Sequence, residues 1–305
     1  TMKHADDYLD VQNNDSLAVT YTVNGETKTA RTSSDYYELA KVYAQKLIAN
    51  RKYKMNTDFH QIFKNECQWV KTVNEDVMYE VAFVKNSGGD VAWCIGLSVV
   101  GGSYGSGTSY TQLSAPYVLS FDQDDQRYGA TVANYIYHTD KKQKPVKANA
   151  SVPAKWCRLW LPENPGASSS KSTGINWPIM RYSDVLLMLA EAENELNGPT
   201  DLAKDALKQV RERAFINSSK KTEKVDNYVN ALADKTSFFE AIVNERAWEF
   251  GGEMMRKWDL VRWNKFGEKV LQMIAMQDKM GRESNLINST GDEDKSLSPS
   301  NEYAD

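Results

Sequence analysis

Apolar residues recur at the spacing of one helical face in three blocks of the chain. The first block lies within residues 35–56, where the apolar face consists of Ala40, Tyr43, Ala44, Leu47 and Ile48. Lysine and glutamine side chains fall mainly on the other face, and Ser34 or Asp35 can cap the N-terminus. The pattern predicts an amphipathic helix.

The second block, "NWPIMRYSDVLLMLAEAENELNG" at residues 176–198, has the strongest pattern in the chain. Its proline biases the preceding residue away from helix, and Ser183 or Asp184 can cap the helix that follows. The first two turns are apolar on nearly every side, so we expect neighbouring elements to enclose them. The apolar run is too short to cross a bilayer, which needs roughly 18 residues or more.

A second helix is predicted from Asp201, after the helix-breaking sequence "NGPT". Its predicted buried stripe consists of Leu202, Ala206, Val210 and Ala214, and its predicted solvent-facing residues are Lys204, Asp205, Lys208, Arg211 and Glu212. Two helices joined by a short Gly-Pro turn form a hairpin of the tetratricopeptide type. The match is to this architecture, because the strict repeat consensus is absent.

The third block begins with a predicted capping box formed by Ser237 and Glu240. Gly251-Gly252 interrupts the helix, and "EMMRKWDLVRWNKF" resumes it. The residues after about 280 are rich in Ser, Asn, Asp and Glu, so a loose tail is predicted for 280–305.

Residues 57–175 show shorter and more varied patterns. We expect a short helix in "DFHQIFKNE", an extended segment in "DVMYEVAFV" and another in "TVANYIYH". Seven glycines within residues 86–110 indicate a loop whose backbone bends sharply or approaches another group closely. An N-terminal hairpin is expected around Asn24-Gly25. The predicted fold class is therefore mostly α, with tetratricopeptide-like hairpins and a loop-rich, partly β irregular region, in one domain spanning 1–305.

Composition excludes several classes of function. The net charge of −4 gives no electrostatic case for nucleic acid or an anionic membrane as partner. The three cysteines and three histidines are dispersed, so no zinc, iron–sulfur or other metal site is predicted and no cofactor is expected. Whether any of Cys67, Cys94 and Cys157 pair stays open.

Acidic and basic residues alternate densely in "ERAWEFGGEMMRKWDLVRW". Two carboxylates between Glu245 and Asp259 could serve a helical glycoside hydrolase as acid and base or nucleophile. However, each acid has an arginine at helical distance, which would lower its pKa and make it a poor proton donor. A structural network of Arg–carboxylate pairs is the favoured interpretation.

The glycine-rich segment and its flank carry the better candidate for a binding site. Aromatic rings stack on sugar faces, and neighbouring polar groups fix the orientation of the ligand. The candidate carbohydrate-binding residues are Trp93, Tyr104, Tyr110, Tyr117 and Asp90. The alternative for Trp93 and Tyr117 is that they are core residues beneath the loop.

Several patterns occur together in one order: "YYELAKVYAQKLIANRKYKM", "DQDDQRYG", "WPIMRYSDVLLMLAEAENEL", "ALKQVRERA" and "AIVNERAWEFGGEMMRKWDLVRW". From about residue 35 to 265 the chain resembles the C-terminal part of the SusD/RagB family of outer-membrane glycan-binding lipoproteins. The family's recurring residues, mainly architectural, match here at Asp125, Arg127, Arg181, Asp184, Glu191, Glu245, Arg246, Glu253, Arg256, Asp259 and Arg262.

This resemblance implies a SusD-like fold without catalysis or a required cofactor. It also implies oligosaccharide or polysaccharide as ligand, a TonB-dependent, SusC-like barrel as partner, and a cell-surface location held by a lipid anchor. Family members are usually longer and carry the lipid-bearing cysteine in an N-terminal part, so we expect this chain to be a fragment. The rival hypotheses are the hydrolase above and an intracellular tetratricopeptide adaptor that binds peptides.

Overall fold

The computed structural model describes residues 18–289, apart from residues 24, 86, 139–141, 147–149 and 165–170, and describes side chains as far as residue 283. The α-helices are α2 (Ser33–Ala49), α3 (Phe59–Cys67), α4 (Ala115–Val118), α5 (Arg127–Thr131), α6 (Tyr182–Asn197), α7 (Asp201–Ala214), α8 (Tyr228–Asn230), α9 (Lys235–Glu249), α10 (Arg256–Arg262) and α11 (Phe266–Ser289). The strands are β1 (Val19–Val23), β2 (Glu26–Ala30), β3 (Val77–Val81), β4 (Val132–Ala133), β5 (Tyr135–Tyr137), β6 (Gln143–Pro145), β7 (Val152–Pro153) and β8 (Trp177–Arg181).

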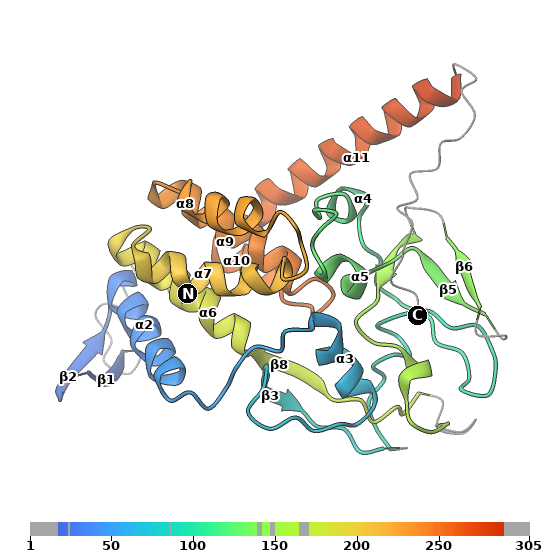
Figure 1. Ribbon diagram of the computed structural model, residues 1–305, viewed down its shortest axis with the longest axis horizontal. Coiled ribbons are helices and arrows are strands. Elements are labelled where there is room, and N and C mark those ends of the chain that lie inside the picture. The colour runs from blue at the N-terminus through green and yellow to red at the C-terminus, as the bar shows by residue number, and fades with distance from the viewer. Residues whose placement is uncertain are drawn as a thin grey trace.

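Helices dominate one side of the molecule and loops with short strands dominate the other (Figure 1). Within the described residues the strands pair two by two and antiparallel, as β1-β2, β3-β8, β4-β7 and β5-β6. The predicted fold class, mostly α with a loop-rich, partly β region, is confirmed.

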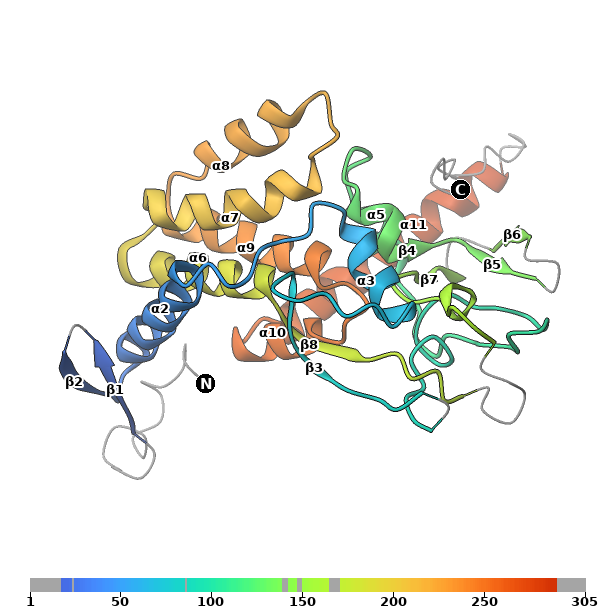
Figure 2. The same cartoon turned by 60° about the horizontal axis from the view of Figure 1, so that its bottom comes forward.

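Helix α6 is the centre of the helical region and packs against α2, α7 and α9 (Figures 1 and 2). Val185, Leu186 and Ala190 are fully buried, which confirms that the apolar first turns are enclosed on all sides. Full burial of a leucine or valine side chain contributes roughly 1.5–3 kcal/mol, so this helix anchors the main core. The hairpin predicted from residues 176–198 and the helix that begins at Asp201 is present as α6 and α7.

The helix starts differ from those predicted from sequence. Thr32, rather than Ser34 or Asp35, caps α2, and Asp35 completes its capping box from within the first turn. Asp234 caps α9 through the backbone N–H groups of Thr236 and Ser237, so the box predicted at Ser237 does not form. In both cases the true cap lies two or three residues upstream, because the first turn is polar and gives no apolar signal.

At the start of α6 neither Ser183 nor Asp184 is the cap. Arg181 occupies the N-cap position and makes no side-chain cap bond, since its guanidinium is engaged in buried ion pairs. Asp184 lies in the first turn, where its charge is favourable at the positive end of the helix dipole.

Arg211 was predicted to face solvent and is instead buried. The periodicity of α7 assigned it to the polar face because it is charged, but it pairs with a carboxylate from α9. A fully paired guanidinium can lie within a core, which hydrophobic patterning alone does not detect.

The loop-rich region is built around α3 and the two-stranded ribbon β3-β8. The expected short helix and the first expected strand are both present, and β8 is the extended run that precedes α6. Phe59, Phe63 and Trp156 are fully buried and make edge-to-face contacts beneath the loops. This small core fixes the loops that follow β3.

Helix α11 continues to Ser289 and projects from the body (Figure 1). The loose tail predicted from residue 280 is therefore wrong for 280–289, and its remainder lies outside the described residues. The Glu, Lys, Gln and Met residues that favour helix lie mainly in the earlier part of α11, and the helix that they form continues through 280–289. In the described part of the chain, no helix combines the length and apolarity that a membrane span requires.

Candidate ligand-binding site

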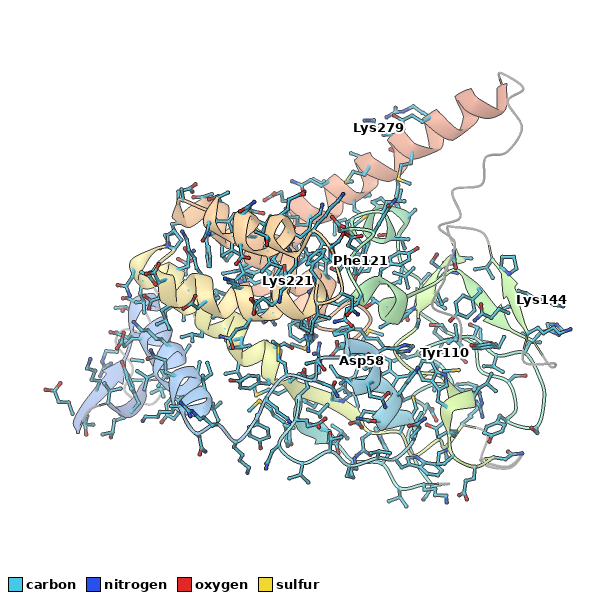
Figure 3. The ribbon with its side chains drawn as sticks, viewed as in Figure 1. Asp58, Tyr110, Phe121, Lys144, Lys221 and Lys279 are labelled. Atoms are coloured by element: carbon cyan, nitrogen blue, oxygen red, sulfur yellow. The ribbon has the colours of Figure 1, made fainter. Side chains whose placement is uncertain are left out.

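Two aromatic side chains of the glycine-rich segment lie together at the surface. The ring centroids of Trp93 and Tyr110 are 5.6 Å apart at an interplanar angle of 80°, an edge-to-face contact. Tyr110 is 71% exposed, and Trp93 is partly exposed. Figure 3 shows Tyr110 on the loop-rich side of the molecule. We refer to these two residues as the aromatic pair.

The backbone brings these two rings together from residues that are 17 positions apart. Thr108 donates its N–H to the Trp93 carbonyl and Tyr110 donates to the Cys94 carbonyl, each at 2.8 Å. At Gly107 a Cβ atom would lie 2.9 Å from the Ala92 carbonyl oxygen, so a side chain would disturb this approach. The predicted close backbone approach is thus found at this glycine.

Charged groups flank the aromatic pair. Lys171 Nζ lies 4.4 Å from the centroid of the Trp93 ring. Asp90 is exposed, and its backbone carbonyl accepts hydrogen bonds from the N–H groups of Trp93 and Cys94. Sequence reasoning missed Lys171, because it lies far along the chain and no motif surrounds it.

Two other predicted residues do not join this pair. Tyr104 is only partly exposed and packs against the core that contains Trp156. Tyr117 lies on α4 and donates its hydroxyl to the Ala247 carbonyl at 2.9 Å. Burial raises the pKa of the Tyr117 phenol, which accords with a structural contact. The alternative interpretation of Tyr117, a core residue, fits its position better.

The acidic residues of the third block lie in a buried ion-pair cluster. We define this cluster as Asp76, Asp125, Arg127, Lys155, Arg181, Arg211, Arg213, Glu245, Glu249 and Glu253. Every member is at most 6% exposed. The pairs join α5, α7, α9, β8 and the segment before β3, so the cluster ties the two regions of the molecule together.

Glu245 accepts from Arg127 and from Arg211, each at 2.7 Å. Glu249 is surrounded by three arginines: Arg181 at 2.7 Å, Arg127 at 3.4 Å and Arg213. Burial alone would raise the pKa of Glu249, but these guanidiniums outweigh it and hold the pKa well below the usual range. A carboxylate so stabilised cannot donate a proton near neutral pH.

Glu253 has a similar environment. It accepts from Arg181 at 2.9 Å and from Lys155 at 2.5 Å. Burial opposes ionisation, yet these two cations lower the pKa of Glu253. The favoured structural interpretation of the acidic block therefore agrees with the geometry. From sequence, four cluster members are assigned to no ion-pair network, namely Asp76, Lys155, Arg211 and Arg213.

A second set of ion pairs joins α6, α9 and α10. Arg246 bridges Asp184 and Asp259 at 2.6 and 2.7 Å. Arg262 pairs with Glu191 at 2.6 Å and with Asp259 at 2.9 Å. Arg256 is the exception among the matched arginines, because its Nη1 donates to the Val243 carbonyl at 2.7 Å and no ion pair is found for it among the described residues.

No metal-binding group of His, Cys, Asp and Glu side chains is found in the part of the chain that the structure describes. Within "DQDD", Asp122 accepts the backbone N–H of Asp124, while Asp125 is buried and pairs with Arg127 at 2.7 Å. The acidic turn is thus organised by the protein's own groups. The described Cys67, Cys94 and Cys157 are free thiols.

Comparison with known proteins identifies the relatives of this chain. The SusD family matches over residues 9–303. SusD-like proteins P25 and P38 of Formosa agariphila are 32% identical over 179 residues and 37% identical over 152 residues. These matches cover 59% and 49% of this chain but only 30% and 28% of the relatives. The chain thus corresponds to part of the length of these proteins.

Solved structures share the fold. A SusD homolog from Bacteroides thetaiotaomicron superposes with a TM-score of 0.70 at 26% identity, covering 78% of this chain and 50% of that one. Surface glycan-binding protein A from the same organism, in complex with laminarihexaose, gives a TM-score of 0.55 at 18% identity, covering 87% and 60%.

The sequence match extends over nearly the whole chain, and the helical framework is shared with a solved SusD homolog. On these two grounds this chain belongs to the SusD family.

Proposed function

We propose that the protein binds oligosaccharide or polysaccharide at the cell surface without catalysis and passes it to a TonB-dependent, SusC-like barrel. The observation that carries this proposal is the aromatic pair, which is exposed on a loop framework in a SusD family member. Membership in the family and the fold shared with a glycan-binding protein support the same function.

The aromatic pair suits the flat, weakly polar faces of sugar rings. The 71% exposed ring of Tyr110 and the partly exposed Trp93 present apolar surface that a pyranose can cover. Lys171 lies over the Trp93 ring, and Asp90 is exposed on the turn that precedes Trp93, so both can offer hydrogen bonds to hydroxyl groups. Such a site gives affinity through a few contacts, and its described residues include no pair of carboxylates beside the rings.

The hydrolase alternative needs two carboxylates that reach a substrate and exchange protons with it. Glu245, Glu249 and Glu253 are buried and held by arginine or lysine. Binding without turnover is therefore the better-supported function for this chain.

The proposed surface location, the lipid anchor of the full-length protein and the barrel partner rest on family membership. They distinguish this proposal from the intracellular peptide-binding adaptor, for which the tetratricopeptide-like hairpin is the main argument. Detection of the intact protein on the surface of unbroken cells, by antibody or by protease shaving, separates the two.

Isothermal titration calorimetry of the intact protein against a panel of soluble glycans, laminarihexaose included, tests the binding proposal. Trp93→Ala and Tyr110→Ala should each weaken the best ligand about tenfold or more, as expected for aromatic anchors at a binding site. Tyr79→Ala is the matched control, because Tyr79 is 64% exposed but lies on β3. Absence of binding to every glycan, or equal effects of all three substitutions, would refute the proposal.

A further inference from the structure

A mainly apolar pocket lies on the helical side of the molecule, where α11 leaves the body beside α4 (Figure 1). It has a volume of about 450 Å³ and is enclosed by residues of α4, α9, α10 and α11. Its walls include Leu113, Pro116, Leu260, Val270, Met273 and Met276. We call it the α11 pocket. Its size falls in the range of small-molecule sites.

Arg256 is the one arginine among the residues that line this pocket. The other matched arginines, Arg127, Arg181, Arg246 and Arg262, each pair with at least one carboxylate. For Arg256 the structure gives a single hydrogen bond, from Nη1 to the Val243 carbonyl, and no ion pair among the described residues. Most of the donors of this guanidinium thus have no protein partner in the described part of the chain.

The two acids that attract Arg256, Asp259 and Glu240, already form ion pairs with other residues. Asp259 binds Arg246 and Arg262, and Glu240 binds Lys265 and Lys269. Burial lowers the pKa of Arg256 despite the attraction of these acids. A partly buried guanidinium with no ion-pair partner among the described residues is costly in an apolar setting, and an anion from outside the protein would offset that cost.

The residues that line the α11 pocket indicate the chemistry of the part of the ligand that does not contact Arg256. Methionine and aliphatic side chains adapt to flexible apolar chains, and Met273 and Met276 of α11 line the α11 pocket together with Arg256. We propose that the α11 pocket binds a carboxylate with an aliphatic tail, of the fatty-acid class, with the carboxylate on Arg256 and the tail along α11. This inference concerns a site separate from the aromatic pair and does not depend on the proposed glycan function.

Three probes with the same ten-carbon chain test the proposal on the intact protein by calorimetry below their micellar concentrations. Decanoate should bind, decanol should bind about tenfold or more weakly, and decyltrimethylammonium should not bind. A charge-assisted bidentate hydrogen bond accounts for a difference of this size. Equal binding of all three would show that only the apolar walls act and would overturn the assignment of Arg256.

Two variants and a matched control complete the test. Arg256→Gln should remove the preference of decanoate over decanol, whereas Lys257→Gln removes a neighbouring exposed charge outside the pocket and should leave it unchanged. Met273→Trp should weaken decanoate and decanol alike, because the indole fills the pocket. Absence of decanoate binding to the unaltered protein, or an unchanged preference in a folded Arg256→Gln protein, would overturn the proposal. Circular dichroism establishes that each variant is folded.

Discussion

The helical region and the loop-rich region each bury a glutamate, and the two glutamates are treated in opposite ways. Glu249 of α9 is surrounded by three arginines, which hold its pKa well below the usual range. Glu66 of α3 has no such partner. Burial, reinforced by the carboxylate of Glu80, raises the pKa of Glu66 to about 8.

The two glutamates illustrate a difference between the helical region and the loop-rich region. In the helical region buried charges are paired in geometries that fix helices relative to one another. In the loop-rich region Glu66 is buried beside another carboxylate, and the exposed rings of the aromatic pair lie there. Rigid framework and variable loops are the usual separation between fold and binding site.

The largest expected effect comes from removing the central charge of the helical region. Glu249→Gln leaves Arg181 and Arg213 without full compensation inside the protein, and we expect the free energy of unfolding to fall by about 3–5 kcal/mol. Urea unfolding measures the change. Glu240→Gln is the control, because Glu240 pairs with two lysines at the surface and should cost under about 1 kcal/mol. Similar losses in the free energy of unfolding for both variants would mean that Glu249 contributes no more to stability than a surface ion pair.

The next effect concerns Glu66 and depends on pH. Since the folded-state pKa is raised, its contribution to stability is fully present below the unfolded value of about 4.5 and is lost as pH rises through about 8. We expect the unaltered protein to lose on the order of 3 kcal/mol more than Glu66→Gln between pH 5 and pH 8. The pKa of Glu80 is lowered, because hydrogen bonds from Lys71 and Asn176 outweigh the opposing effect of burial. Its contribution to stability is therefore lost only as pH falls below about 4.5, outside the range from pH 5 to pH 8.

Thermal or urea unfolding of both proteins at the two pH values measures this difference. Parallel stability curves for the unaltered protein and Glu66→Gln would show that Glu66 is not the unpaired counterpart of Glu249.

A smaller effect is expected where the two regions meet. At Gly251 a Cβ atom would lie 1.8 Å from the Tyr117 hydroxyl oxygen and 2.9 Å from Cζ, so Gly251→Ala should cost about 1–3 kcal/mol. Tyr117→Phe in the same chain removes the closest atom and should recover part of that loss. Gly267→Ala is the control and should cost nothing, because nothing lies within 4 Å of its Cβ position. A loss that Tyr117→Phe does not reduce would mean that the tyrosine is not the obstacle.

Much of the helical region could be predicted from sequence, because an apolar stripe and a turn suffice to define each helix. Arg211 shows the limit of that reasoning, since a charged residue on a periodic helix is assigned to solvent unless its partner is known. The partner, Glu245, lies 34 residues away. The caps at Thr32 and Asp234 were missed for a related reason, because the polar first turns carry no periodic signal.

For the loop-rich region, the sequence predicts irregular backbone with close approaches but not which side chains meet. The glycines of residues 86–110 indicated close backbone approach, and Gly107 beside Ala92 is one such place. Which rings would meet could not be deduced, because loop contacts such as Trp93 with Tyr110 depend on tertiary hydrogen bonds and not on spacing. Tyr117 was grouped with these rings by sequence proximity, yet it packs against α9.

The division between framework and binding surface is tested most directly on Tyr110→Ala, with glycan affinity and the free energy of unfolding measured on the same protein. Tyr110 is 71% exposed, so its removal should change the free energy of unfolding by no more than about 0.5 kcal/mol. Calorimetry should nevertheless show about a tenfold or greater loss of affinity for the best glycan of the panel. Unchanged affinity in the folded variant would contradict the account.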